Sequence, residues 1–169
     1  MDRLPIGRGI ARARQTAAPS STKPIDWKCD LEALEECMLA FALSTFVVHT
    51  AFEILFGLRA YLTGGSSSQT AEEIAAQPPR ATMPARFLGA ALLALGLIGL
   101  MVILGPGVTS ETARIAATGF AVFHGLGAVG VVIAARRDAS VLAPVLTKGA
   151  LTIHGVLAIA FAVLALTAV

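Results

Sequence analysis

FLGAALLALGLIGLMVIL, residues 87–104, is the stretch of sequence that decides the fold of this chain. None of its 18 residues carries a polar side chain. As an α-helix they extend over about 27 Å, which is just enough to cross the hydrocarbon core of a bilayer. A helix that is apolar on all sides belongs in a large protein core or in a membrane. The stretch therefore predicts a transmembrane helix.

The composition of the whole chain agrees with a location in lipid. Of its 169 residues, 56% are hydrophobic and 14% are charged, against a usual charged share of about 25%. A soluble domain of this length could not cover so much apolar surface with so few charges. The net charge is +2, and the basic residues are not interleaved with aromatic ones, so nothing predicts nucleic-acid binding. We expect the lipid bilayer to be the main partner.

Three further apolar stretches predict three more spans, so that the four lie at about residues 37–62, 87–104, 115–135 and 145–169. Asp26 or Asp30 can cap a helix that leads into the first of them. The connections after the second and third spans are short, which makes consecutive helices antiparallel neighbours. Residues 26–169 are therefore predicted to form an all-α, antiparallel four-helix bundle of a multi-pass integral membrane protein.

Two polar segments lie outside the predicted spans. Residues 1–25 contain five basic side chains, one acidic side chain and three prolines, which predicts a disordered basic tail. This tail has no long apolar run, so it is not a secretory signal peptide, but its composition also fits an organelle transit peptide. Organelle and plasma membrane therefore both stay open. Residues 63–86 predict a polar loop with a short surface helix around residues 70–76.

Three histidines and one glutamate lie inside the spans: His49, Glu53, His124 and His154. Their positions along the spans place all three histidines near the middle of the bilayer. His49 and Glu53 are four residues apart, which puts them on one face of the first helix. His124 and His154 are expected to face each other, because their helices are antiparallel neighbours. We therefore predict one intramembrane polar cluster.

The function of this cluster is open to several interpretations. Charged groups at the centre of a span cost about 2.5 to 3.5 kcal/mol, so these residues should turn inward and pair. Hydrogen bonds that fix helix packing are the simplest role, and the leading prediction is a small membrane protein that binds or supports a larger membrane system. The alternatives are a haem- or quinone-linked redox protein, a transition-metal site, a proton relay, and an enzyme acting on a lipid-soluble substrate.

No motif selects among these alternatives. The chain has no Gly-x-Ser-x-Gly and no His-Glu-x-x-His sequence, so no catalytic residue and no defined metal-ligand set is assigned. Haem is a cofactor that the histidines could bind, since glycine follows both His124 and His154 and leaves room for a flat macrocycle. The cofactor is otherwise unknown.

Small residues predict where helices approach closely. Ala117, Ala121 and Gly125 recur every four residues and form a helix-packing stripe on the third span. A second copy of the chain or another membrane protein is a possible partner for such a bundle. The phenylalanines of the spans are interpreted as core and lipid contacts and not as a cofactor pocket.

The chain is similar in layout to the DoxX-like group of small four-helix membrane proteins. The similarity rests on its size, its four spans, and the segment FEILFGLR at residues 52–59, which ends the first span with a glycine and a charge. It implies the four-helix fold. The group includes redox-associated and assembly-associated members, so the resemblance assigns no residue roles.

Overall fold

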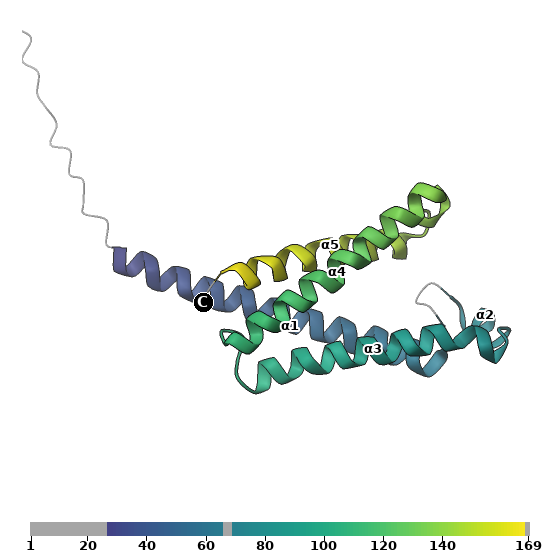
Figure 1. The fold of residues 1–169 in the computed structure, drawn as a ribbon, viewed down its shortest axis with the longest axis horizontal. Helices are drawn as coiled ribbons and strands as arrows, with labels where there is room; N and C mark the ends of the chain where they lie inside the picture. Colours follow the sequence, from purple (N-terminus) through teal and green to yellow (C-terminus); the bar gives the residue numbers. More distant parts are fainter. Residues whose placement is uncertain (1–26, 66–68, 168–169) are drawn as a thin grey trace, which may run out of the picture.

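The computed structural model describes residues 27–65 and 69–167, which form helices joined by turns (Figure 1). The tail predicted at residues 1–25 lies outside these described residues. In chain order the elements are α1 (Trp27–Thr63), α2 (Ala71–Ala75), α3 (Pro79–Leu104), α4 (Glu111–Arg137), the 3-10 helix η1 (Ala139–Leu142) and α5 (Val145–Leu166).

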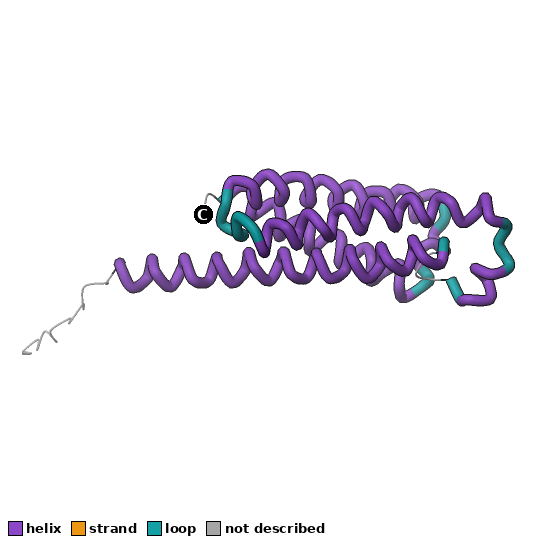
Figure 2. The backbone as a smooth tube through the Cα atoms, turned by 90° about the horizontal axis from the view of Figure 1, so that it is seen from below, coloured by secondary structure: helices purple, strands orange, loops and turns teal. Residues whose placement is uncertain are grey.

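In the described part of the chain, four helices are long and apolar enough to cross a membrane: α1, α3, α4 and α5. They run antiparallel in chain order and pack together (Figures 1 and 2). The predicted all-α four-helix bundle is therefore confirmed, and its apolar helices fit a multi-pass membrane protein. With 37 residues, α1 is about 55 Å long, so its first turns project beyond the other helices (Figure 2).

The helix ends follow local capping signals. Thr70 and Glu73 form a capping box at the start of α2, and the Ser110 side chain accepts a hydrogen bond from the backbone of Ala113 at the start of α4. The helix α3 begins at Pro79 and not at residue 87, where the second span was predicted. Proline is favoured in the first helical turn because the backbone N–H that it lacks has no partner there, so Pro79 suits the start of α3, about two turns before the apolar stretch.

The four long helices form two closely packed pairs, α1 with α3 and α4 with α5. Glycines allow the approach within the first pair. A Cβ added to Gly89 would lie 2.4 Å from the backbone nitrogen of Tyr61, and one added to Gly57 would lie 3.0 Å from the Gly89 carbonyl oxygen. Backbone therefore packs against backbone along this interface.

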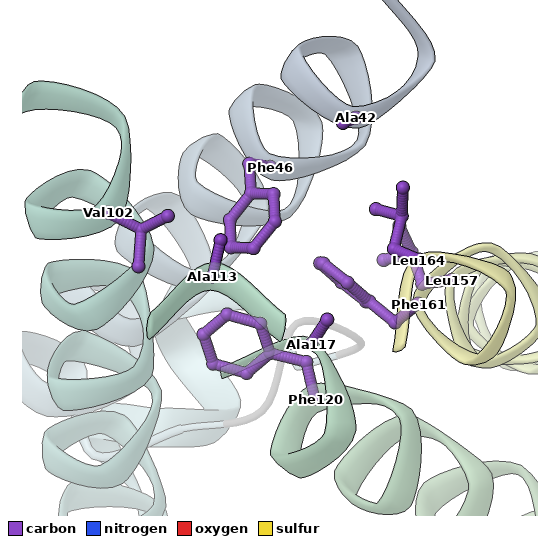
Figure 3. Packing of buried hydrophobic residues seen from close by; sticks show 9 residues of the cluster. All are labelled: Ala42, Phe46, Val102, Ala113, Ala117, Phe120, Leu157, Phe161 and Leu164. Atoms are coloured by element: carbon purple, nitrogen blue, oxygen red, sulfur yellow. The ribbon is translucent and has the colours of Figure 1, made fainter. Parts of the chain in front are cut away.

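The two pairs meet at an aromatic core. Phe46 of α1, Phe120 of α4 and Phe161 of α5 are all buried, with ring centroids 5.1 to 6.0 Å apart (Figure 3). Small and aliphatic side chains complete this core: Ala42, Val102, Ala113, Ala117, Leu157 and Leu164. Away from the core the pairs diverge toward the end of the molecule where α2 lies (Figure 1).

Gly89→Ala is expected to destabilise the bundle by about 1 to 3 kcal/mol, because the added methyl group meets the backbone of α1 and forces the helices apart. Unfolding of the reconstituted protein in mixed micelles measures this change. The control is Gly130→Ala, since Gly130 of α4 is exposed and its added Cβ would meet nothing within 4 Å. Equal stability of the two variants would contradict the close α1–α3 interface.

Candidate functional site

The structure brings His49, Glu53, His124 and His154 together beside the aromatic core. His49 and Glu53 come from successive turns of α1, His124 from α4 and His154 from α5. The first three are buried, with exposed fractions of 0%, 5% and 1%, and His154 is half-buried. One polar cluster thus joins three of the four long helices.

The three imidazoles form a continuous chain of contacts. His49 Nδ1 lies 3.0 Å from His124 Nε2, and His124 Nδ1 lies 2.8 Å from His154 Nδ1. Both distances are hydrogen-bond distances, so His124 uses both of its ring nitrogens. In neutral rings these two hydrogen bonds can run in either direction, with His124 donating one of them and accepting the other.

The chain of imidazoles ends at the aromatic core. The His49 ring lies 4.0 Å from the Phe120 ring and 5.1 Å from the Phe161 ring, measured between centroids. Its Nε2 is buried without a hydrogen-bond partner. A proton that reached His49 would meet an apolar layer on the far side. This arrangement does not suit a relay that crosses the whole membrane.

Glu53 approaches two of the imidazoles without hydrogen bonding to them. Its Oε1 lies 3.8 Å from His49 Nδ1 and 3.8 Å from His124 Nε2. Both separations exceed hydrogen-bond length. The carboxylate oxygen and the two ring nitrogens form a compact triangle of electron-pair donors.

A cavity of about 600 Å³ lies between the two helix pairs, next to this triangle. Its walls are mainly apolar and come from α1, α3, α4 and α5, with Phe52, Phe56 and Leu88 among them. Glu53, His124 and His154 contribute polar groups, and Arg59 contributes another near the end of α1. The cavity therefore runs from the polar cluster toward the end of the bundle where the pairs diverge.

Sequence reasoning missed the side chains that make this cavity. Phe52, Phe56 and Phe123 were interpreted as core or lipid contacts, but they line it. Their spacing on the helices does not separate the two roles, because the cavity arises from the angle between helix pairs. Arg59, the charge that ends the segment at residues 52–59, also lines the cavity and donates a hydrogen bond to the Gln69 carbonyl.

The predicted small-residue stripe on α4 has mixed surroundings. Ala117 is buried in the core and Ala121 packs against it, but a Cβ added to Gly125 would meet nothing within 4 Å. Glycines allow closer approaches in the α1–α3 pair instead. There the glycines of α3 sit against α1, and a Cβ on Gly99 would come to 2.3 Å from Thr50 Oγ1.

The cluster does not have the arrangement of a haem bound between two histidines. Two axial imidazoles lie on opposite faces of the macrocycle, with the iron between their nitrogens. His124 and His154 are instead in direct contact at 2.8 Å. No step of the function is therefore assigned to haem.

Comparisons of the chain with protein-family models, with curated proteins and with solved structures gave no match. The resemblance to the DoxX-like group stays a prediction. The function must therefore be argued from the site alone.

A double-mutant cycle with His124→Leu and His154→Leu should give a coupling energy between about 0.6 kcal/mol, the average for hydrogen bonds between membrane helices, and about 1.7 kcal/mol, the largest value found for them. The measurement is the unfolding free energy of the wild type, both single variants and the double variant. As a control, His124→Leu is combined with Thr118→Ala, because Thr118 is exposed and bonds to its own helix. The hydrogen bond is refuted if the two coupling energies are equal.

Proposed function

We propose that this chain is a multi-pass membrane protein that binds a small lipid-soluble molecule in the cavity between its two helix pairs. One observation carries the proposal: three of the polar side chains that line an apolar cavity, Glu53, His124 and His154, belong to the buried cluster. Small-molecule sites usually have volumes of about 300 to 1,000 Å³, mostly apolar walls and a few convergent polar groups. The cavity of about 600 Å³ has all three properties.

The lining suggests how such a molecule is oriented. Its apolar part would lie against Phe52, Phe56 and Leu88, and its polar head would face Glu53 and His154. Imidazole can donate or accept a hydrogen bond, and a carboxylate accepts one. A hydroxyl group on a ring or chain, as in hydroxylated lipids, can donate to the Glu53 carboxylate and accept from the His154 imidazole, whereas a quinone carbonyl can only accept from the imidazole.

Binding of a lipid-soluble molecule is also consistent with the prediction that the protein supports a larger membrane system. A protein with a lipid-soluble ligand can deliver it to, or hold it for, neighbouring membrane proteins. The histidine chain reaches the cavity at His154, so a bound head group can exchange a proton with the cluster. This exchange is also what acid–base chemistry on such a ligand would require.

Gly149→Leu is expected to fill the cavity and reduce the amount of co-purifying ligand at least tenfold. Gly149 lines the cavity, and an added Cβ there would meet nothing within 4 Å, so the longer side chain can enter without a backbone clash. Native mass spectrometry of protein extracted directly into nanodiscs measures the bound molecule.

Gly130→Leu is the matched control, because Gly130 is exposed and equally open but does not line the cavity. It should carry the same ligand as the wild type. The proposal fails if Gly149→Leu retains the ligand in the wild-type amount, or if the wild type carries none.

A further inference from the structure

The geometry points to a binding site for one divalent transition-metal ion, held by His49 Nδ1, His124 Nε2 and Glu53 Oε1. This inference goes beyond ligand binding in the cavity and does not depend on it. It rests on the spacing of three donor atoms, on the contacts of His124, and on the position of the cavity.

The first observation is the spacing of the donor atoms. The three atoms are separated by 3.0, 3.8 and 3.8 Å. A point equidistant from them lies about 2.1 Å from each, and bonds from Zn²⁺ to imidazole nitrogen or carboxylate oxygen are about 2.0 to 2.2 Å long. An ion can therefore be bound to all three atoms with little movement of the side chains.

The second observation explains why hydrogen bonding accounts poorly for Glu53. Its Oε1 is too far from either imidazole nitrogen to accept a hydrogen bond, yet it lies equally close to both. A carboxylate buried to this extent in an apolar bundle needs a compensating charge or a donor. A divalent ion shared with the two imidazoles provides that charge.

The third observation is the outer contact of His124. A metal-bound histidine almost always donates its second ring N–H to an acceptor, which fixes its tautomer and orientation. With Nε2 on the metal, His124 Nδ1 carries the proton and can donate it to His154 Nδ1 at 2.8 Å. His154 is then a positioning residue for the metal ligand His124.

The donor set also indicates the class of ion. Two imidazoles and one carboxylate suit Zn²⁺, and they suit Fe²⁺ in sites with open coordination positions. Glu53 and His124 also line the cavity, so an open position would be reachable by a molecule bound there. The cavity also offers a path by which the ion can enter the buried site.

Metal analysis of the full chain tests the proposal. The protein is purified in detergent, treated with a chelator, loaded separately with Zn²⁺ and with Fe²⁺ under anaerobic conditions, and desalted. We expect about one ion per chain in the wild type for at least one of the two metals. Glu53→Gln and His124→Gln should each lower this to less than about a tenth of an ion per chain.

Two further variants separate direct ligands from other residues. His154→Gln should keep the site but weaken metal affinity about 10- to 100-fold, as expected for the partner of a ligand. Glu36→Gln is the control for surface binding, because Glu36 is exposed on the first turns of α1, and it should bind as the wild type does.

X-ray absorption of the loaded wild type makes the test independent of whether the variants fold. We expect the spectrum to show scattering from two imidazoles. The nitrogen and oxygen ligands should lie about 2.0 to 2.2 Å from the metal. Less than about a tenth of an ion per wild-type chain for both metals, or a spectrum without imidazole, would overturn the proposal. Gly149→Leu narrows the entry path but leaves the three donor atoms in place, so it should load metal more slowly and reach the wild-type amount at equilibrium, which keeps loss of the cavity ligand and loss of the metal distinguishable.

Discussion

The structure depends on the need of buried ionisable side chains to find partners inside the protein. Lipid and apolar side chains offer no hydrogen bonds, so an isolated imidazole or carboxylate at this depth is costly. The contact between His49 and His124 meets this need across the two helix pairs, and that between His124 and His154 meets it within the second pair. The aromatic core next to His49 excludes water from the same region.

The cavity exists because the two helix pairs pack densely at one end of the bundle and move apart toward the other end. At one end Phe46, Phe120 and Phe161 fill the space between the pairs (Figure 3). Toward the other end α1 and α3 stay together through their glycines, α4 and α5 stay together as well, and the pairs move apart (Figure 1). The polar cluster lies between the aromatic core, which contacts His49, and the cavity, which Glu53, His124 and His154 line. A molecule that enters between the pairs therefore meets Glu53, His124 and His154.

Much of this arrangement could be predicted from the sequence, because depth in a membrane helix follows from residue count. The apolar stretches predicted the four helices, the positions of His49, His124 and His154 along them predicted a common depth, and the spacing of Glu53 from His49 predicted a shared helix face. The angle between helix pairs could not be predicted, since it depends on which small residues meet. The small-residue stripe predicted on α4 illustrates this: Gly125 has open space beside it, whereas Gly89 packs against the backbone of α1. The cavity and its phenylalanines depend on that angle and were therefore missed.

The central claim is that three imidazoles and one carboxylate form a single cluster inside the bundle. Solid-state nuclear magnetic resonance of the chelator-treated protein in lipid bilayers, with ¹⁵N-labelled histidine, tests it most directly. The account predicts through-space contacts from the His124 ring nitrogens to both His49 and His154, at the hydrogen-bond distances of 3.0 and 2.8 Å. Three separate imidazoles that contact water and not one another would contradict it.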